Sequence, residues 1–407
     1  MKKISKGIRY LQLLLPLLLF NLLNAQLNYS GSLNPGNMYR LSDQSEISLP
    51  FRIAEAEVGY SLGDFEIKTN SAFEYRWSNN ENELQLREAY ITWYPNWGEV
   101  KVGKQIHAWG AVDGNNPTDN LNPYDYYYMF LSGAERKVGT VSGSVKYYWN
   151  DWQMEGVFIP KHEANRFPFG EEAFPLDIPM SAPKLMDEEP CSEFGFRFQS
   201  TLGSSDFSLS YFDGRDRSFS YVGVTDSMPS FFYRKTSVLG FDLVSFIGDF
   251  TNRFEIGYFL TKNDTEVDSI TINDASYIQF AGQVEYSTEN DIMLSVQIIG
   301  SEISEINGTM TKDEFQTGMG TPFATFTDLG LSFSASTNYY DDALELMGNT
   351  FIDLKDSQSM LGASVKYSPI NNWKIKMSIS KFMGEEGTQF YNMEDFSHLK
   401  VGLEFHF

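Results

Sequence analysis

The side chains that most often carry out catalysis are scarce in this 407-residue chain, which has four histidines and one cysteine. A hydrolase needs a nucleophile beside its base, and the sequence has no serine elbow motif to supply one. His398 and His406 share a face of one predicted strand, eight residues apart, which separates them by about 26 Å. The other candidates are His107, His162 and Cys191, of which we interpret Cys191 as a small, partly buried residue. The sequence therefore predicts a protein that is not an enzyme.

Oxygen ligands for a metal ion are gathered in one segment, between residues 110 and 125. Their spacing lacks the regularity of a calcium-binding loop, and the preference of Asn and Asp for tight turns explains the same composition. We predict no metal and no cofactor, with calcium in this segment as the alternative. The residues are Asp113, Asn115, Asn116, Asp119, Asn122 and Asp125.

Charged residues that alternate with apolar residues are the main candidates for function. If their strands close into a barrel, a lysine group near the C-terminus and an acidic group in the middle of the chain lie on different walls. Such an arrangement would set up a field across the lumen that filters polar solutes; alternatively, these charges only solvate the wall and pair locally. The predicted pore-lining residues are Glu66, Lys68, Glu74, Arg76, Lys101, Lys104, Arg197, Asp242, Glu255, Glu285, Lys366, Lys374, Lys376 and Lys400.

The elements that would position these charges are strands, because apolar and polar residues alternate with period two along most of the chain. At the C-terminus, for example, Leu399, Val401 and Leu403 alternate with Lys400 and Gly402. We predict eighteen strands, with sixteen as the alternative because the first strand and the two between 325 and 356 are the weakest. Their ranges are 26–41, 46–62, 64–78, 84–95, 98–109, 136–149, 152–160, 192–202, 205–214, 237–248, 252–261, 277–288, 291–301, 325–337, 343–356, 358–369, 373–382 and 397–407.

A soluble sandwich would also alternate, but three features favour a membrane barrel. Aromatic residues such as Trp93, Trp149 and Trp373 stand at strand ends, where a bilayer interface would lie. Tight turns alternate with long polar loops, as short periplasmic turns and long outer loops do in barrels. The chain ends in Phe407 on an apolar face, which resembles the signal read by the barrel-assembly machinery. We therefore predict an all-β, transmembrane, antiparallel up-and-down barrel, wide enough for an aqueous lumen.

The N-terminus predicts export. Basic residues at its start precede a run from Leu11 to Leu23 that is almost wholly apolar, and Ala25 follows, which is the order of a secretory signal peptide. We predict a signal peptide at 1–25 and a single barrel domain at 26–407, placed in the outer membrane of a Gram-negative bacterium. Without the four basic residues of the leader, 27 Lys+Arg face 54 Asp+Glu, a net charge of −27. This charge excludes nucleic acid as a partner.

The stretch from Leu86 to Arg136 reads L-R-E-A-Y-I-T-W, then V-K-V-G-K-Q-I-H-A-W-G-A-V-D-G, then D-N-L-N-P-Y-D, then E-R. It resembles an uncharacterised, loosely porin-like family of outer-membrane barrels in Gram-negative bacteria, in which an arginine is usual where this chain has Lys104. The resemblance implies a passage or export-accessory role, with no known substrate and no catalytic residue. The motif residues are Arg87, Glu88, Tyr90, Gly103, Gln105, Trp109, Gly110, Asn122, Pro123 and Asp125.

Lys104 is an exception to the alternation, because it shares the apolar face of Val100 and Val102. A charge facing lipid near the bilayer midplane costs about 2–4 kcal/mol. We predict a bulge at Gly103 that turns Lys104 toward the lumen, where it would pair with Glu88 or Glu99.

The segment from Lys161 to Glu189 is rich in proline and phenylalanine, and we predict that it folds into the barrel because exposed phenylalanines are costly in water. The resulting hypothesis is a porin-like channel for passive passage of small polar solutes. The alternatives are a component accessory to an exporter, or a surface-binding barrel. A transporter of hydrophobic ligands is disfavoured because no N-terminal plug precedes the first strand. The sequence indicates neither the solute nor the oligomeric state.

Overall fold

The computed structural model describes residues 27–131, 133–176, 181–183, 185, 191–225, 228–262, 274–308, 311–312 and 315–407. The predicted signal peptide lies outside these residues. Within them, no helix is both long and apolar enough to cross a membrane.

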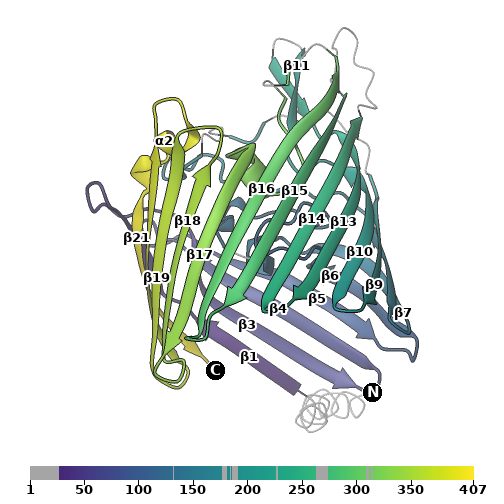
Figure 1. Cartoon of the computed structure of the whole chain (residues 1–407), viewed down its shortest axis with the longest axis horizontal. Helices are drawn as coiled ribbons and strands as arrows, with labels where there is room; N and C mark the ends of the chain where they lie inside the picture. The colour runs from purple at the N-terminus through teal and green to yellow at the C-terminus, as the bar shows by residue number, and fades with distance from the viewer. Residues whose placement is uncertain are drawn as a thin grey trace, which may run out of the picture.

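The chain forms a closed antiparallel β-barrel of eighteen strands (Figure 1). The first strand position is divided into two pieces, β1 and β2, and the others follow one another around the ring. The strands are β1 (Leu27–Leu33), β2 (Gly36–Arg40), β3 (Phe51–Leu62), β4 (Phe65–Tyr75), β5 (Asn82–Trp93), β6 (Gly98–Gln105), β7 (Thr140–Trp149), β8 (Trp152–Ile159), β9 (Glu193–Leu202), β10 (Ser205–Arg215), β13 (Lys235–Ile247), β14 (Phe250–Lys262), β15 (Asp274–Ser287), β16 (Ile292–Asn307), β17 (Leu329–Tyr339), β18 (Leu344–Asp353), β19 (Gln358–Ile370), β20 (Trp373–Gly384) and β21 (His398–His406).

The barrel closes between its first and last strands. β1 pairs with β3 along its whole length, and its end pairs with β21 at Ser32–His406 and Leu33–Phe405. Pro35, which cannot donate to a ladder, separates β1 from β2, and β2 continues the pairing with β21. The terminal Phe407 exchanges two backbone hydrogen bonds with Gly31, both 3.1 Å long. All strand edges of the wall are therefore paired.

The predicted fold is confirmed, because each of the eighteen predicted segments corresponds to a strand of the barrel. The alternative of sixteen strands is wrong. Two differences stand out. A hairpin of β11 (Ser220–Thr225) and β12 (Met228–Phe232), which was not predicted, rises from the outer loop after β10 (Figure 1). Predicted strands 46–62 and 98–109 are shorter than expected at their outer ends, because the chain leaves the wall there.

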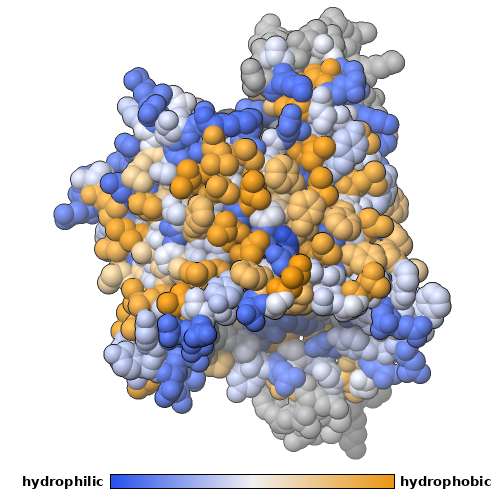
Figure 2. Space-filling model, in the orientation of Figure 1, coloured by the Kyte–Doolittle hydropathy of each residue, from blue (hydrophilic) through white to orange (hydrophobic). Residues whose placement is uncertain are grey.

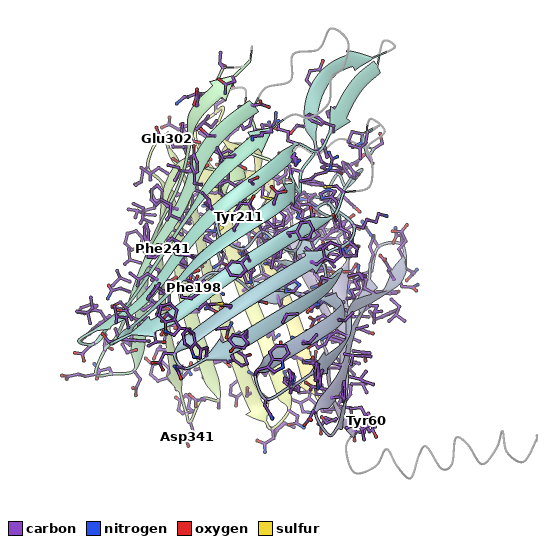
Figure 3. The ribbon with its side chains drawn as sticks, turned by 90° about the vertical axis from the view of Figure 1, so that its right-hand side faces the viewer. Tyr60, Phe198, Tyr211, Phe241, Glu302 and Asp341 are labelled. Carbon is purple, nitrogen blue, oxygen red and sulfur yellow. The ribbon has the colours of Figure 1, made fainter. Side chains whose placement is uncertain are left out.

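The outward face of the wall is apolar, as a lipid-facing surface must be. Figure 2 shows apolar side chains in a broad band between hydrophilic ends. Phe198, Leu209 and Phe241 form one outward row across β9, β10 and β13. Figure 3 labels Phe198 and Phe241 of this row. Near the short turns, the ring of Trp97 lies 6.2 Å from the ring of Trp93, which adds to an aromatic girdle.

Within the described residues, the outer loops contain the short helices η1 (Tyr126–Tyr128), η2 (Gly133–Arg136), η3 (Pro322–Thr325), α2 (Gln389–Asn392) and η4 (Glu394–Phe396). Their buried side chains include Tyr126, Phe390 and Phe396. These residues belong to an apolar core inside the barrel, so the outer loops fold inward and pack against the wall.

Candidate functional site in the barrel lumen

The lumen is crossed by the long loop between β6 and β7, residues 106–139. Asp113 donates its backbone N–H to Gln283 of β15 at 2.9 Å, and Asn115 donates its side-chain amide to Gln297 of β16 at 2.8 Å. β15 and β16 stand nearly opposite β6 in the ring of strands. The loop therefore spans the barrel from one wall to the other, and we call it the crossing loop.

Glu255 of β14 holds the turn at the tip of the crossing loop. Its carboxylate accepts hydrogen bonds from the backbone of Ala111, and from the backbone of Val112 at 2.6 Å. It also accepts from the side chains of Asn116 at 2.8 Å and Thr118 at 3.0 Å. Glu255 is fully buried, so its carboxylate loses its hydrogen bonds to water. These four donors replace them.

Gly110 allows the backbone at the tip of the crossing loop to approach the carboxylate of Glu255. Its φ of +97° lies in a region that other residues rarely adopt. A Cβ atom at this position would also lie 2.6 Å and 2.7 Å from the two carboxylate oxygens of Glu255. The glycine of the W-G motif therefore lets the backbone come close to an acidic side chain on the opposite wall.

The near end of the crossing loop is held by Asn122. Its side-chain oxygen accepts from the backbone of His107 at 2.6 Å, and its amide donates to the carbonyls of Gln105 and Val138, both at 3.0 Å. Burial lowers the pKa of His107 to about 3, so its ring is neutral. The side-chain amide of Asn122 thus joins the segment that leaves the wall after β6 to the segment that returns to it before β7.

Other motif residues anchor the same loop. Glu88 accepts a hydrogen bond from the backbone of Ile106 at 2.9 Å, and the indole of Trp109 donates to Glu155 of β8 at 3.0 Å. Tyr90 differs: it lies on the wall below, where the ammonium of Lys101 stands 4.8 Å from its ring centre. The sequence motif is therefore largely the set of contacts that positions the crossing loop.

An ion-pair network fastens the crossing loop to β3, β4 and β5. Arg52 lies 3.1 Å from Asp125 and 3.5 Å from Glu74. Arg87 lies 3.2 Å from Glu135. Burial raises the pKa of the Asp125 carboxyl, while the charges of Arg166 and Arg52 oppose that rise. Arg52, Glu135 and Arg166 were not predicted, because nothing in the sequence shows that their partners lie within reach.

The described part of the loop after β8 also folds inward. Arg166 lies 2.9 Å from Glu74 and 3.0 Å from Asp125. Glu171 accepts a hydrogen bond from Arg76 at 2.8 Å, and Phe174 is buried in the core. Residues 161–176 therefore pack over the crossing loop, whereas 177–180, 184 and 186–190 lie outside the described residues.

Lys104 is not turned toward the lumen as predicted. It pairs with Ala89 of β5 and Val141 of β7 in a ladder with no shift of register. Val141 is exposed on the outward face, so Lys104 shares that face. Gly103 does have an unusual φ of +139°, but the shift of register lies on β5, between the rungs Asn70–Glu88 and Ser71–Leu86. Near the outer end of β6, the side chain can reach the membrane surface, where a charge costs less.

Neither predicted partner binds Lys104. Glu88 accepts from Ile106, and the Glu99 carboxylate lies 3.4 Å from Lys101 and 3.8 Å from Lys146. Burial raises the pKa of the Glu163 carboxyl, and the charge of Lys104 opposes that rise. The prediction failed because the strand ends just beyond Lys104, so no correction of the alternation was needed.

The other predicted charges on the strands follow the inward face, and most are paired locally. Asp242 lies 3.0 Å from Arg197, and Glu285 lies 3.1 Å from Arg253. On the opposite wall Lys366 and Lys374 share Glu345, at 2.9 Å and 3.1 Å, and Lys376 pairs with Glu404. Pairing of this kind weakens a field across the lumen, so local pairing describes most of these groups.

The crossing loop divides the lumen into two unequal parts. Along β7 to β16, the inward side chains of the middle and outer rungs are buried, as Ser142, Ser208 and Gln279 illustrate. Ser142 contacts His107 of the crossing loop, and Gln279 contacts Met319 and Thr321 of the loop after β16. Along β17 to β21 and β3 to β4, inward residues such as Ser334, Ser364 and Asn70 keep partial exposure. The space beside this second arc, which we call the open arc, is therefore accessible to water.

An apolar cluster covers the outer end of the open arc. It joins inward side chains of the wall to side chains of five outer segments, and all its members are buried. We call it the outer cap. Its members are Met38, Ile47, Leu49, Phe51, Tyr124, Tyr126, Met129, Phe174, Ile299, Phe326, Phe351, Phe382, Phe390, Met393 and Phe396.

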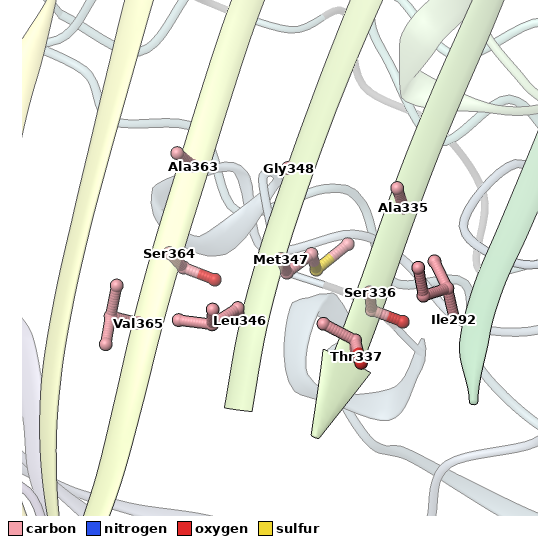
Figure 4. Close-up of a pocket in the computed structure, with 10 residues that line it drawn as sticks. All are labelled: Ile292, Ala335, Ser336, Thr337, Leu346, Met347, Gly348, Ala363, Ser364 and Val365. Atoms are coloured by element: carbon pink, nitrogen blue, oxygen red, sulfur yellow. The ribbon is translucent and has the colours of Figure 1, made fainter. Parts of the chain in front are cut away.

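A shallow hollow on the outside of the wall is unrelated to the lumen. Figure 4 shows it across β17, β18 and β19, where Ala335, Gly348 and Ala363 leave space beside Leu346 and Val365. Its lining is largely apolar and turned toward lipid. Among the described residues, no group of three His, Cys, Asp or Glu side chains could hold a metal ion.

No model of a known protein family matches the sequence, and no curated protein matches it. Solved structures do resemble the fold. OccK11 (OpdR) of Pseudomonas aeruginosa has a TM-score of 0.53 at 10% identity, over 93% of this chain and 95% of that chain. A BenF-like porin from Pseudomonas fluorescens Pf-5 has a TM-score of 0.55 at 10% identity, over 95% and 99%. OccK5 (OpdH) of P. aeruginosa has 0.55 at 9% identity, over 94% and 97%.

The chain has the fold of an outer-membrane porin. A closed barrel with an apolar outer belt belongs in the outer membrane, which agrees with the predicted location. The likeness to the solved structures extends over nearly the whole length of each chain. It concerns the arrangement of the strands, and the passage itself must be argued from the side chains of this protein.

Proposed function

We propose that the protein is a porin-like channel through which small polar solutes diffuse across the outer membrane. The observation that carries the proposal is the open arc, an inward wall whose partly exposed side chains are mostly polar, with Met347 of β18 between Ser336 and Ser364. Ser332, Ser334 and Ser336 lie on β17, and Ser364 and Ser378 continue the same face on β19 and β20. Hydroxyl groups exchange hydrogen bonds with water and solute at little cost in free energy. This wall therefore suits the diffusion of polar solutes without any reaction.

The crossing loop has a defined place in this proposal. It closes most of the other half of the lumen, so solutes would pass beside β17 to β21 and β3 to β4 rather than through the centre. Of the predicted pore-lining residues, Lys366, Lys374, Lys376 and Lys400 then line the passage, and Glu66 and Lys68 face it from β4. Asp242 and Glu255 would act as supports of the filled half.

Two further parts of the proposal concern biogenesis. Residues 1–25 would be removed after export as a signal peptide, which leaves 26–407 as the barrel domain. The terminal Phe407 would be the residue that the barrel-assembly machinery reads. In support, its side chain is half exposed at the seam of the barrel, where the last strand would be handed to the first.

A second candidate is a barrel that opens only with a partner, as an exporter component or surface receptor would. The outer cap favours it, because fifteen buried side chains stand over the open arc. The two candidates differ in whether the cap opens unaided. Spontaneous thermal opening suits a simple channel, and lasting closure suits a partner-dependent one.

Single-channel conductance of the refolded protein in planar bilayers tests the proposal. We expect ohmic steps from the wild type and larger steps after deletion of residues 386–396, which removes α2 and η4 from the cap. Deletion of 221–230 in the β11–β12 hairpin is the matched control and should leave conductance unchanged. A barrel that conducts only after the 386–396 deletion supports the partner-dependent candidate. A barrel that never conducts contradicts both.

Charge reversal tests the route. Lys374→Glu together with Lys376→Glu should shift the reversal potential toward cation selectivity, because these lysines flank the open arc. The control is Asp242→Asn in the filled half, which should leave selectivity near the wild-type value. If the lysine variant had the same ion selectivity as the wild type, the passage would not run beside these lysines.

A further inference from the structure

Three basic side chains stand side by side on the outward face of the wall, where β10, β13 and β14 reach the outer loops. Arg215 of β10 pairs directly with Lys235 of β13, and Lys235 pairs directly with Lys262 of β14. By the alternation of their strands, these residues share the outward face of Leu209 and Leu239, which are exposed toward lipid. We call Arg215, Lys235 and Lys262 the basic row.

The basic row stands at the upper edge of the apolar belt. Two outward rungs nearer the membrane centre, Tyr211, Leu239 and Tyr258 form a row across the same three strands (Tyr211 is labelled in Figure 3). Tyrosine side chains favour the boundary between hydrocarbon and headgroups. Four residues along a strand rise by about 13 Å. The basic row is therefore at the level of the lipid headgroups in the outer leaflet.

The cations of the basic row are presented to their surroundings. Lys235 and Lys262 are exposed, and Arg215 is half-buried. The guanidinium of Arg215 donates a hydrogen bond to the backbone carbonyl of Tyr233 at 2.9 Å, which holds it near the start of β13. Like charges that stand directly opposite each other on neighbouring strands repel, and an anion placed along the row would reduce this repulsion.

Acidic side chains border the basic row without interrupting it. Asp213 lies one outward rung below Arg215, where its Oδ2 atom accepts hydrogen bonds from Ser237 at 2.7 Å and from Tyr211 at 3.2 Å. The outward face becomes acidic beyond β14, so the positive charge is confined to three strands. The acidic residues there are Asp274 on β15 and Glu302 and Glu305 on β16.

We infer that the basic row binds the phosphate group of a lipid in the outer leaflet, whose acyl chains lie against the apolar wall below. Ammonium and guanidinium groups donate short, charge-assisted hydrogen bonds to phosphate oxygens. Because neighbouring strands are about 5 Å apart, the row is about 10 Å wide, and its long side chains can converge on one headgroup. Leu209 and Leu239, each 54% exposed, offer the acyl chains a surface.

A soluble phosphate ion offers the same oxygens but no apolar part. The lipid is the better match, because the exposed side chains below the row would add apolar contacts to the ion pairs. The site goes beyond the proposed passage, since it lies on the outside of the barrel and takes no part in conduction.

Native mass spectrometry of the refolded barrel, released from neutral detergent, tests the site by counting bound lipids. The probes are lipid A, the same lipid after removal of its phosphates, and inorganic phosphate. We expect lipid A to bind saturably, and its dephosphorylated form at least about tenfold more weakly. Inorganic phosphate at equal concentration should displace little lipid A. Equal binding of the two lipids overturns the inference, and displacement by inorganic phosphate would show a site for a soluble anion instead.

Variants of the basic row separate it from a general attraction of lipid to positive charge. Lys235→Gln together with Lys262→Gln should weaken binding of lipid A by at least about tenfold, because two charged donors are lost. Lys235→Arg together with Lys262→Arg should keep most of the affinity. If the glutamine pair failed to fold, Lys262→Gln alone would test the row, with a smaller loss in the same direction.

The matched control removes the same charge from two single outward lysines. Lys104 and Lys381 also stand near the outer ends of their strands, but their cross-strand neighbours include the apolar Val141 and Leu361. Lys104→Gln together with Lys381→Gln should change the affinity for lipid A less than about twofold. Unchanged affinity in the row variants, or an equal loss in the control, contradicts the proposal. Either result leaves the conductance of the channel untouched, so the site and the channel can fail separately.

Discussion

The carboxylate of Glu255 on β14 lies 2.6 Å from the backbone nitrogen of Val112, which precedes it by 143 residues. This contact fixes the tip of the crossing loop to the far wall of the barrel. The loop is tethered at its near end by Asn122 and by the ion pairs of Arg52 and Arg87. A polar contact at the tip and a polar network at the base together decide how much of the lumen is filled.

Glu255→Leu should release the loop tip. Four buried donors would lose their acceptor, and each unmade buried hydrogen bond costs about 1–3 kcal/mol. We expect a lower midpoint of thermal unfolding and larger, noisier conductance steps. Glu302→Leu, at an exposed position on β16, is the control and should leave both properties unchanged. A quiet, wild-type channel in Glu255→Leu would show that the tip contact does not hold the loop.

Gly110→Ala should have a similar effect by a different cause. The methyl group would meet both oxygens of Glu255, and the φ of +97° would be strained. We expect a loss of about 1–3 kcal/mol in the free energy of unfolding, measured by urea titration in lipid vesicles. Gly348→Ala is the matched control, because a Cβ there meets nothing within 4 Å and its φ is ordinary. Equal stability of the two variants would refute the argument.

Loss of one arginine from the network should cost more than loss of a surface pair. Among the described residues, Arg52→Met leaves the buried Glu74 and Asp125 with Arg166 as their ion-pair partner. Removal of one member of a buried pair costs about 3–5 kcal/mol. We expect the urea midpoint to fall clearly in Arg52→Met, and hardly at all in Lys355→Met, whose pair with Asp328 is exposed. Comparable changes would show that the network contributes little.

The strands could be predicted from the sequence because each residue of a barrel wall faces either lipid or lumen, and alternation records that choice locally. The crossing loop could not. Its contacts join Asp113 to Gln283 and Asn115 to Gln297, about half the chain away, and its Asn, Asp and Gly residues equally suit a surface turn. We predicted an inward fold for the loop after β8 because of its phenylalanines. The loop that crosses the lumen is instead held by polar side chains.

The same limit applies to the charges. Which face Lys366 or Asp242 occupies follows from the alternation, but whether a charge finds a partner depends on the register between strands. Glu345 meets two lysines because β18, β19 and β20 align as they do. The register also brings Arg215, Lys235 and Lys262 side by side on the outward face, which no local pattern reveals.

Asp216 should make the outer loops more stable in mild acid than at neutral pH. It is buried just beyond β10, where Thr236 donates a hydrogen bond to it at 2.5 Å, and burial raises its pKa to about 6 against the opposing charges of Arg234 and Arg217. Because the folded pKa exceeds the unfolded value of 3.8, the folded state binds more protons between the two. Its contribution to stability is therefore greatest at low pH and is lost as the pH rises through about 6.

Hydrogen exchange can measure this effect. Amides of residues 216–218 and 234–236 should be better protected at pH 5 than at pH 7.5, after correction for the intrinsic exchange rate. In Asp216→Asn, which is neutral at both values, the difference should vanish. A pH dependence that persists in Asp216→Asn would assign it to another group.

The seam gives the last prediction. The ring of Phe407 lies over Gly31, so closely that a Cβ at Gly31 would overlap it and would also meet the carbonyl oxygen of Glu55 at 2.6 Å. Gly31→Val should therefore push the last residue off the first strand and slow closure of the barrel. We expect slower refolding into vesicles, followed by the mobility shift between heated and unheated samples in gel electrophoresis. Gly143→Val is the control, since a Cβ there meets nothing within 4 Å. If both variants refold at the wild-type rate, packing of Phe407 on Gly31 does not limit closure.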